Sequence, residues 1–453
     1  MGRLFGTDGV RGIANKELTP ELAFKLGKAG AYVLKKKNER PVVVIGKDTR
    51  VSGDMLEAAL TAGILAVGGN VIRAGVVPTP AVAYLTRYYH ADAGIVISAS
   101  HNTFEYNGIK FFNGEGFKLD DLLEEKIEDI IISSIDVNSH ITGDQIGKCL
   151  EAEDDAADLY VQRLLDTVDY RLDGRKVVLD CANGASYQIA ERVYNALGAD
   201  VTVIGNEPNG ININEACGST HPEKLQAEVV RQGADIGLAF DGDADRLIVV
   251  DNLGRVVDGD KTIAICAKML KKEGRLVDDK VTATVMSNIG FHKDMEAAGI
   301  SVDVTGVGDR YVLESMLKTG CVIGGEQSGH IIFLEHTTTG DGVMSSLQLV
   351  KAMLKDGRTM AEMSDEIKIY PQVLVNARIH NDHKKTYMND PEVAAEIAAV
   401  EEAVAGNGRL LIRPSGTEPL VRVMMEGSDI DQIRPLAENL AALIQNKFSQ
   451  PAE

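Results

Sequence analysis

The sequence predicts an α/β protein built from three similar α/β domains, each with a mixed sheet flanked by helices, and a smaller C-terminal α+β domain. Length is the first observation, because 453 residues at roughly 150 per domain correspond to three or four domains. The second is a repeat of glycine, valine three residues later and glycine four residues after that. It occurs at Gly68/Val71/Gly75, Gly198/Val201/Gly205 and Gly299/Val302/Gly306.

Each copy of the repeat follows a stretch of helical periodicity and is typical of a helix end, a short buried strand and a turn. The preceding helices are expected over residues 55–67, 188–197 and 291–298. Further along each unit, a second apolar strand runs into a polar loop. These strands and loops are 93–97 with 98–102, 235–240 with 241–246, and 321–323 with 324–330. Ligands bind at the carboxyl ends of strands in α/β sheets, so we expect the three loops to meet in one cleft.

Domain boundaries follow from the repeat and from local composition. The acidic stretch 151–155 is typical of a linker or the start of a connecting helix, and residues 252–255 form a turn pattern. Beyond residue 370 the pattern changes to that of a smaller α+β domain, with strands expected over 373–379, 409–412 and 422–426 and a helix over 391–405. The predicted domains are 1–150, 151–253, 254–370 and 371–453.

Charge and composition exclude several classes of function. The net charge of −20 disfavours nucleic acid or an anionic membrane as the main partner, although an anionic substrate fits if basic residues converge locally. No apolar run approaches the roughly 18 residues that a membrane span needs, and we expect a cytoplasmic protein. The five cysteines include no C-x-x-C pair, which predicts reduced, buried thiols rather than a disulfide framework or a structural zinc site.

The loop Ser98-Ala99-Ser100-His101-Asn102 presents a hydroxyl at a strand exit. Ser100 could carry a phosphoryl group if donors and a metal neutralise the added charge. The alternatives are a helix N-cap or a local turn, whereas a serine hydrolase is excluded because no G-x-S-x-G motif occurs. His101 is a further catalytic candidate, but neighbours on a strand point to opposite faces, which is poor geometry for a serine–histidine dyad.

Three carboxylates at alternate positions form the second loop, and they are Asp241, Asp243 and Asp245. Hard oxygen ligands at this density indicate Mg²⁺, with open positions left for phosphate oxygens. A calcium EF-hand does not fit, because Arg246 stands where glycine is required and Asn252 where glutamate is required. A solvated acidic turn is the alternative, but the planar fork of Arg246 suits a phosphate beside the metal.

The third loop places the carboxylate of Glu326 two residues from the hydroxyl of Ser328, so both can reach one side and bind vicinal sugar hydroxyls. His330 follows as a donor or proton carrier. A tight glycine-rich turn without a ligand is the alternative reading. Arg11 and Lys110 each lie close to glycines, which predicts ordered loops rather than helix faces.

The C-terminal domain contributes an anion nest of guanidinium groups, hydroxyls and backbone N–H groups. Its members are Arg413, Ser415, Gly416, Thr417 and Arg422. Neither a Walker A loop nor a complete G-x-G-x-x-G occurs, so nucleotide hydrolysis and a dinucleotide cofactor are not supported. Four loops thus offer a nucleophile, a metal site, sugar contacts and a distal phosphate site.

Taken together, six motifs resemble the α-D-phosphohexomutase family over essentially the whole chain, and in particular its bacterial members that act on glucosamine phosphates. The motifs are FGTDGVRG (5–12), SASHN (98–102), NGIKFF (107–112), DGDADR (241–246), GEQSGH (325–330) and RPSGTEP (413–419). One departure is Thr103, where the family usually has proline. Proline would stiffen the loop without supplying a chemical group, so we expect little loss of function.

The resemblance implies four domains around a deep cleft and a small phosphosugar as substrate. Ser100 would carry the phosphoryl group, and its oxygen and the three aspartates would hold one Mg²⁺. By the same resemblance Glu326 and Ser328 grip the sugar, the residues of the anion nest hold the non-reacting phosphate, and Arg11, Lys110 and His330 lie near the reacting one. Arg246 counts among the substrate-binding residues.

The mechanism implied by the family converts glucosamine 6-phosphate into glucosamine 1-phosphate through a 1,6-bisphosphate, which also serves as activator, at the entry to amino-sugar nucleotide synthesis for cell-wall precursors. Lys110 and His330 are the acid/base candidates. The open alternatives are a phosphomannomutase or phosphoglucomutase with the same machinery, a catalytically silent sugar-phosphate binder and a simple phosphatase. Gln327 favours the glucosamine enzyme by resemblance. A homodimer is left open.

Overall fold

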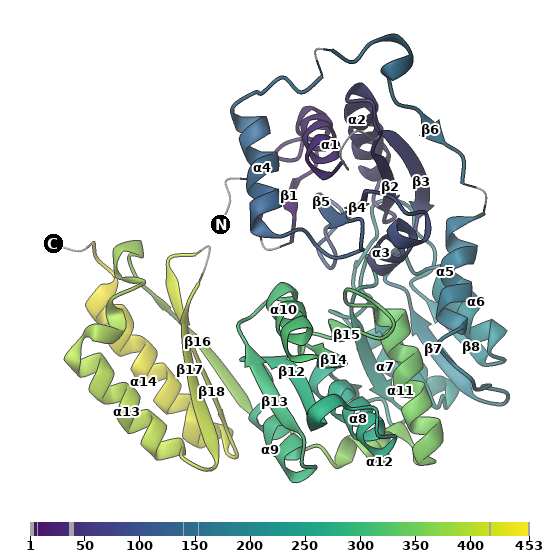
Figure 1. Cartoon of the computed structure of the whole chain (residues 1–453). Coiled ribbons are helices and arrows are strands. Elements are labelled where there is room, and N and C mark those ends of the chain that lie inside the picture. Colours follow the sequence, from purple (N-terminus) through teal and green to yellow (C-terminus); the bar gives the residue numbers. More distant parts are fainter. Residues whose placement is uncertain are drawn as a thin grey trace. The chain divides into compact units, whose positions relative to one another are not determined.

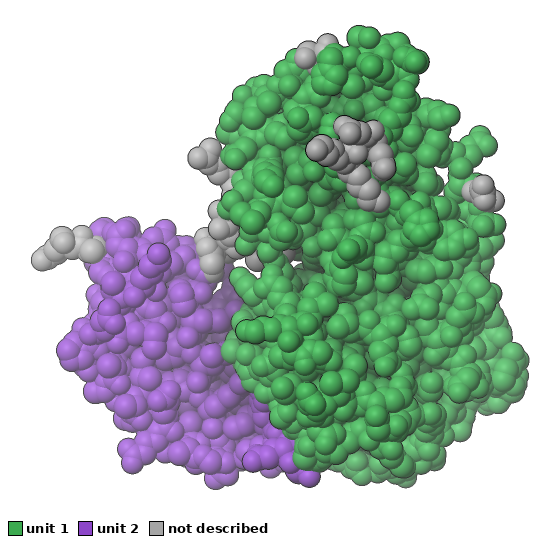
Figure 2. All heavy atoms as spheres, viewed as in Figure 1, with its two compact units in different colours: residues 1–286, 298–366 green, residues 287–297, 367–453 purple. Residues whose placement is uncertain are grey.

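The structure is a computed structural model that describes residues 4–6, 8–35, 40–138, 140–152, 154–415 and 418–451. Figure 2 shows its two compact units. Unit 1 comprises residues 1–286 and 298–366, and unit 2 comprises residues 287–297 and 367–453. Both units combine sheets with packed helices, as Figure 1 shows.

The first sheet of unit 1 has the strand order β1-β5-β4-β2-β3-β6. Its strands are β1 (Val10–Ile13), β2 (Val42–Lys47), β3 (Asn70–Val76), β4 (Ala93–Ile97), β5 (Tyr106–Asn113) and β6 (Cys149–Leu150). Its helices are α1 (Pro20–Leu34), α2 (Gly53–Ala66), α3 (Thr79–Tyr88) and α4 (Asp121–Ile132). β2 pairs in parallel with β3 and β4, whereas β5 runs antiparallel to β4 and β1. The sheet is therefore mixed, as predicted.

The second sheet has the order β11-β10-β9-β7-β8. Its strands are β7 (Lys176–Asp180), β8 (Asp200–Ile204), β9 (Ile236–Phe240), β10 (Leu247–Asp251) and β11 (Val256–Val257). Its helices are α5 (Ala156–Leu165), α6 (Ile189–Ala196) and α7 (Glu223–Gln232). All five residues of β9 and of β10 are buried, which agrees with their continuous apolar sequences.

The third sheet has the order β13-β12-β14-β15. Its strands are β12 (Lys280–Thr284), β13 (Ser301–Thr305), β14 (Ile323–Gly325) and β15 (Ile331–Phe333). Its helices are α8 (Gly259–Lys272), α10 (Asp309–Thr319), α11 (Gly342–Asp356) and α12 (Met360–Asp365). Short 3₁₀ turns occur at Gly143–Gln145, Val277–Asp279, Asn381–His383 and Tyr387–Asn389.

The predicted repeat is confirmed as a repeat of topology. Val71, Val201 and Val302 lie in β3, β8 and β13, and these strands pair in parallel with β2, β7 and β12 respectively. The preceding glycines end the helices in the left-handed region that glycine tolerates, with φ of 81° at Gly68 and 87° at Gly198. On the other side of β2, β7 and β12 lie β4, β9 and β14, and each of these leads through a polar loop into an antiparallel neighbour.

Unit 2 is a three-stranded antiparallel sheet of order β16-β18-β17 with helices packed on it (Figure 1). Its elements are β16 (Gln372–Arg378), α13 (Pro391–Val404), β17 (Gly408–Pro414), β18 (Leu420–Gly427) and α14 (Ile430–Phe448). The strands and the helix predicted for the C-terminal domain are confirmed within a few residues. Helix α9 (Ile289–Ala297) also belongs to this unit, because Glu426 accepts a hydrogen bond from the Ile289 N–H at 2.9 Å.

Three expectations differ from the structure. The strand predicted over 321–323 begins two residues later, as β14. It includes Gly325, which packs so closely that an added Cβ would lie 2.4 Å from the His330 carbonyl oxygen. Arg11 and Lys110 lie in the paired strands β1 and β5 rather than in loops. Cys149 is exposed, whereas the other four cysteines are buried and all five are unpaired.

Candidate active site

The three polar loops predicted from the repeat meet inside unit 1. The β4–β5 loop contacts the β9–β10 loop where the Ser100 hydroxyl donates to Asp241. The β9–β10 loop in turn joins the β14–β15 loop, because the Leu247 N–H donates to the Gly329 carbonyl at 2.9 Å. The convergence expected from strand order is therefore present among these loops.

Ser100 is 1% exposed and adopts a left-handed backbone with φ of 53°. Its hydroxyl donates to Asp241 Oδ2 at 2.6 Å, and its N–H donates to Ser98 Oγ at 2.9 Å. The Ser100 Oγ also lies 3.2 Å from His101 Nδ1. The predicted poor geometry of this pair is wrong, because the backbone at Ser100 is a left-handed turn rather than an extended strand and brings the two side chains together.

His101 is set up to remain neutral. Burial lowers its pKa to about 4, and the guanidinium groups of Arg246 and Arg11 act in the same direction. The imidazole therefore carries one proton at neutral pH. Because the Ser100 O–H is directed at Asp241, a proton on His101 Nδ1 would let that nitrogen donate to the serine oxygen.

The three aspartates form a buried cluster whose ligand oxygens all lie within 4.8 Å of one another. Burial raises the pKa of Asp241 well above its usual value, and the charges of Asp245 and Asp243 add to this shift. One buried oxygen of Asp243 and one of Asp245, the Oδ1 atom in each case, accept no hydrogen bond. Buried carboxylate oxygens that accept no hydrogen bond fit a bound cation, so this cluster can hold a metal ion.

Lys110 supplies positive charge beside the cluster. Its Nζ lies 2.8 Å from Asp243 Oδ2, 3.0 Å from Asp8 Oδ2 and 3.7 Å from Asp245 Oδ2. Burial alone would lower the pKa of Lys110, but the three carboxylates outweigh it and raise the pKa above its usual value. Lys110 is therefore a permanent cation at the site.

Arg11 pairs with Asp8, and Lys118 reaches the other Asp8 oxygen at 2.6 Å. Lys118 also pairs with Asp309 on α10. Burial would raise the pKa of Asp8, but Lys110, Lys118 and Arg11 together lower it well below its usual value. The chain of charges from the aspartate cluster to α10 was not predicted. Asp8 lies in the motif at residues 5–12 but was given no role, and Lys118 and Asp309 lie in none of the six motifs.

His330 is buried between two carboxylates, with Nδ1 at 3.6 Å from Asp245 Oδ2 and Nε2 at 3.6 Å from Asp309 Oδ2. Burial lowers the pKa of His330, whereas the two carboxylates raise it, and the net direction is upward. The Gly340 N–H donates to Nε2 at 3.0 Å, which requires a lone pair there. The geometry therefore places the proton on Nδ1, facing Asp245.

The β14–β15 loop exposes Ser328 and leaves Glu326 half-buried. Glu326 Oε1 accepts the Gly308 N–H at 3.2 Å. Gln327 instead donates to Asp258 Oδ2 at 3.2 Å, at the start of α8. Glu326 and Ser328 are thus available to a ligand, whereas Gln327 anchors the loop.

Two residues of the anion nest predicted for the C-terminal domain lie on neighbouring strands of unit 2. Arg413 on β17 lies directly opposite Arg422 on β18. Burial lowers the pKa of Arg413, and the charge of Arg422 lowers it further. Ser415 is buried, and its carbonyl accepts from Lys384 Nζ at 2.9 Å. Two facing guanidinium groups favour a bound anion. Gly416 and Thr417 lie outside the described residues.

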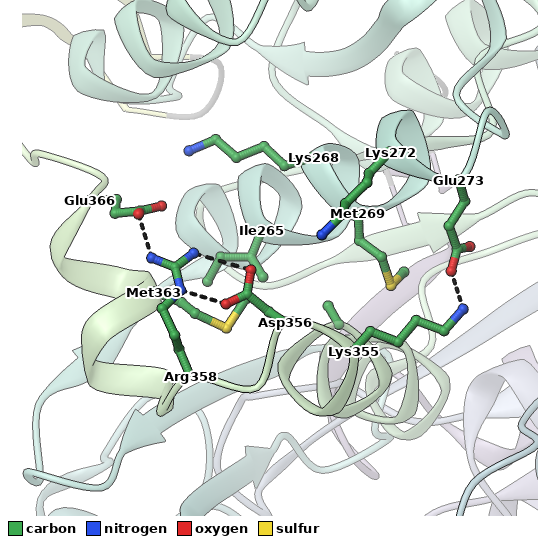
Figure 3. A pocket seen from close by; sticks show the side chains of 11 residues that line it. Ile265, Lys268, Met269, Lys272, Glu273, Lys355, Asp356, Arg358, Met363 and Glu366 are labelled. Carbon is green, nitrogen blue, oxygen red and sulfur yellow. Dashed lines mark hydrogen bonds and ion pairs between the residues drawn. The ribbon is translucent and has the colours of Figure 1, made fainter.

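Figure 3 shows a separate groove of about 440 Å³ between α8, α11 and α12. Its lining includes the apolar side chains Ile265, Met269, Ala352 and Met363. Arg358 pairs with Asp356 and Glu366 at the rim. None of the three polar loops lines this groove, so the chemistry described above lies elsewhere.

Four sequence families match the chain in order. They are the phosphoglucomutase/phosphomannomutase alpha/beta/alpha domain I over residues 2–136, domain II over 158–254, domain III over 258–370 and the C-terminal domain over 374–443. The chain belongs to the phosphoglucomutase/phosphomannomutase family. It is therefore an isomerase of the intramolecular phosphotransferase type, and the predicted fold class is confirmed.

Relatives within this family match over the full length. A phosphoglucosamine mutase of Thermoanaerobacter sp. (strain X514) is 57% identical over 449 residues, covering 99% of this chain and 100% of the relative. One of Clostridium novyi (strain NT) is 55% identical over 447 residues, covering 99% of each. These identities confirm the family resemblance of the six motifs.

Solved structures of phosphohexomutases share the fold. A phosphoglucomutase/phosphomannomutase family protein of Burkholderia thailandensis aligns with a TM-score of 0.82 at 24% identity and covers 99% of both chains. The N-acetylphosphoglucosamine mutase of Aspergillus fumigatus, solved with GlcNAc-6P and magnesium, aligns with a TM-score of 0.70 at 16% identity, covering 98% of this chain and 95% of that one. Among the described residues, no helix combines the length and the apolar character that crossing a membrane demands.

Proposed function

We propose that this phosphohexomutase interconverts glucosamine 6-phosphate and glucosamine 1-phosphate through a phosphoserine at Ser100 and a 1,6-bisphosphate intermediate. The observation that carries the proposal is the buried Ser100 hydroxyl, 2.6 Å from an aspartate of the carboxylate cluster. The names of the full-length relatives support the amino sugar as substrate. This activity would supply 1-phosphates for amino-sugar nucleotide synthesis.

In the first half-reaction, the sugar O1 hydroxyl attacks the phosphorus of phosphoserine. The bond between phosphorus and Ser100 Oγ breaks, its electron pair stays on Oγ, and the O1 proton passes to a base. In the second half-reaction, Ser100 Oγ attacks the 6-phosphate of the turned intermediate, and O6 leaves with a proton. Each half conserves the phosphoryl group, so the bisphosphate can also prime unphosphorylated enzyme.

The basic residues divide into charge stabilisers and proton carriers in this proposal. Lys110 and Arg11 would stabilise the transferring phosphoryl group, because the pKa of Lys110 is raised and it stays charged. Arg246 would contact a phosphate beside the metal. His330 would be the proton carrier within reach of the site, whereas the neutral His101 would donate from Nδ1 to the serine oxygen.

We further propose Mg²⁺ as the metal ion, one per chain, held by Asp241, Asp243, Asp245 and an oxygen of phosphorylated Ser100. When bound, Mg²⁺ would neutralise negative charge on the transferring phosphoryl group. The Oδ1 atoms of Asp243 and Asp245 accept no hydrogen bond, and these free ligand atoms support the assignment.

Substrate contacts complete the proposal. Glu326 and Ser328 would bind the sugar hydroxyls, and Arg413, Ser415 and Arg422 would bind the non-reacting phosphate together with Gly416 and Thr417. The facing arginines of unit 2 support the proposed phosphate contacts.

The four domains are proposed to span 1–150, 151–253, 254–370 and 371–453.

A coupled assay tests the function. Protein with Mg²⁺ and a trace of hexose 1,6-bisphosphate is given the 6-phosphates of glucosamine, glucose and mannose, and formation of each 1-phosphate is followed. We expect the highest kcat/KM for glucosamine, whereas preference for glucose or mannose would keep the mechanism and reject the substrate. Ser100→Ala should lose both turnover and bound phosphate, while Ser133→Ala, at an exposed helix end, should keep both. An active Ser100→Ala enzyme would overturn the phosphoserine mechanism.

A further inference from the structure

Two backbone carbonyls of the Ser100 loop share the same pair of side-chain donors. Arg50 Nη2 donates to the Ser100 carbonyl at 3.1 Å and to the Asn102 carbonyl at 2.6 Å. Asn214 Nδ2 donates to the same two carbonyls, at 2.9 Å in each case. The two donors approach from different parts of the chain, one before β4 and one before β9.

Arg50 is itself held rigidly. Its side chain is fully buried, and it pairs with the equally buried Asp48. A third contact runs from Arg50 Nη1 to Ser98 Oγ at 3.3 Å, and Ser98 Oγ accepts the Ser100 N–H. The guanidinium therefore contacts the Ser100 carbonyl directly and the Ser100 N–H through Ser98 Oγ.

Asn214 reaches the loop from the other side of the site. It is 5% exposed, and its own backbone is left-handed with φ of 59°. Its N–H donates to the Ala182 carbonyl at 2.9 Å, which ties it to the end of β7. The side-chain amide thus links the Ser100 loop to the sheet that carries the aspartate cluster.

The loop needs such support because its conformation is unfavourable. A left-handed backbone is sterically unfavourable for serine, because its Cβ comes too close to the following carbonyl oxygen. The neighbouring chain also packs closely, since a Cβ on Gly242 would lie 2.5 Å from the Ser100 carbonyl oxygen. If the two carbonyls lost their donors, the loop would relax, and Ser100 Oγ would move away from Asp241.

We propose that Arg50 and Asn214 form a clamp on the Ser100 and Asn102 carbonyls that positions Ser100 Oγ for phosphoryl transfer. The inference rests on the proposed phosphoserine mechanism. Neither residue touches the reacting atoms, so both are positioning residues. The clamp acts on the nucleophile and not on the sugar, which predicts a loss in kcat with little change in KM.

Asn214→Gly tests the clamp without adding backbone strain, because glycine accepts the left-handed φ. We expect kcat to fall by about 10- to 100-fold, as for a displaced catalytic group, with KM within about twofold of the wild type. Asn214→Asp keeps the shape but turns oxygen lone pairs toward the carbonyls, and it should lose more. Asn15→Gly is the matched control, since Asn15 is exposed and also left-handed with φ of 60°.

Phosphorus NMR of enzyme primed with glucose 1,6-bisphosphate provides a second readout that does not depend on turnover. We expect the phosphoserine resonance of Asn214→Gly to shift or broaden relative to the wild type and to Asn15→Gly. An unchanged resonance together with an unchanged kcat, or a loss confined to KM, would overturn the clamp. Should the wild type carry phosphate on Ser100 but convert no hexose phosphate, the proposed function would fail while the resonance still tested the clamp.

Arg50→Lys separates the positioning role from stability. Lysine keeps a charge for Asp48, but one ammonium lacks the planar fork that reaches Ser98 Oγ and both carbonyls. A folded variant, judged by a thermal midpoint close to that of the wild type, should show the same kcat-selective loss as Asn214→Gly. Full activity in that folded variant would remove Arg50 from the clamp.

Discussion

Ser100 occupies a backbone conformation that serine rarely adopts, with φ of 53°. Residues in such conformations persist only where their surroundings determine them, and they concentrate at functional sites. Here the surroundings are the hydrogen bonds from Ser100 to Asp241 and Ser98 and the close approach of Gly242. The strain is consistent with a nucleophile held ready beside the aspartates.

At the same scale, a divalent cation bound at the aspartate cluster should stabilise the folded protein. Ligand binding to the native state stabilises it by RT ln(1 + [L]/Kd), about 2.7 kcal/mol at 100 times Kd. We expect Mg²⁺ to raise the thermal midpoint of the wild type in a saturable way, and EDTA to reverse the rise.

In Asp241→Asn, the same titration should need at least about tenfold more Mg²⁺, because one charged ligand is lost. The control Asp278→Asn replaces an exposed aspartate and should respond like the wild type. Equal Mg²⁺ responses in the Asp241 variant and the wild type would argue against metal binding at this cluster.

At the scale of elements, three hairpins with the same topology bring their loops together, and glycines allow the contact. Gly329 has φ of 92°, and a Cβ there would lie 2.1 Å from the Leu247 carbonyl oxygen. The Gly329 carbonyl in turn accepts the Leu247 N–H. Close backbone packing therefore joins the loop that carries Glu326 to the loop that carries the aspartates.

Gly329→Ala should disturb this contact, whereas Gly274→Ala offers a control with φ of 68° and no atom within 4 Å of an added Cβ. Both variants pay the cost of a left-handed alanine. The clash at Gly329 should destabilise that variant by about 1–3 kcal/mol more, measured by chemical denaturation. We also expect a lower kcat/KM only in Gly329→Ala. Equal losses of stability would show that the loops separate without cost.

At the scale of the whole molecule, the sheets of unit 1 are joined by buried polar contacts as well as by apolar packing. The Tyr160 hydroxyl on α5 donates to Asp341 Oδ2 at 2.6 Å, at the start of α11. Burial raises the pKa of Asp341 to about 6 from a usual value of 3.8, although hydrogen bonds from Met344 and Tyr160 oppose this. The protonated carboxyl is thus favoured in the folded state.

This shift predicts a pH dependence of stability. Because folding raises the pKa of Asp341, the stabilisation that its protonated carboxyl contributes is complete below about pH 4 and is lost as the pH rises through about 6. Between pH 7 and pH 5 the wild type should gain about 1 kcal/mol relative to Asp341→Asn, whose side chain does not titrate. Unfolding free energies of both proteins at the two pH values measure this difference. A constant difference would mean that Asp341 keeps its ordinary pKa.

Unit 2 is built from two separate segments of the chain, which a single domain boundary cannot describe. Helix α9 lies in sequence between β12 and β13 of the third sheet, yet it is part of unit 2. Asn288 donates to the Tyr370 carbonyl at 3.0 Å, and the buried Glu426 accepts from the Ile289 N–H. A fragment that begins at residue 371 would lack this helix.

Much of the fold and of the candidate site was predictable because its signals are local. Helical and strand periodicity, the glycine turns and the alternating aspartates act over a few residues, and strand order then places the loops at the ends of β4, β9 and β14. The clamp residues Arg50 and Asn214 were not predictable, nor was the pairing of Lys118 with Asp309. The carbonyls that the clamp binds lie 50 to 114 residues from Arg50 and Asn214, and Asp309 lies 191 residues from Lys118. Such contacts form only when distant segments pack together, and a single sequence carries no periodic or spacing signal for them.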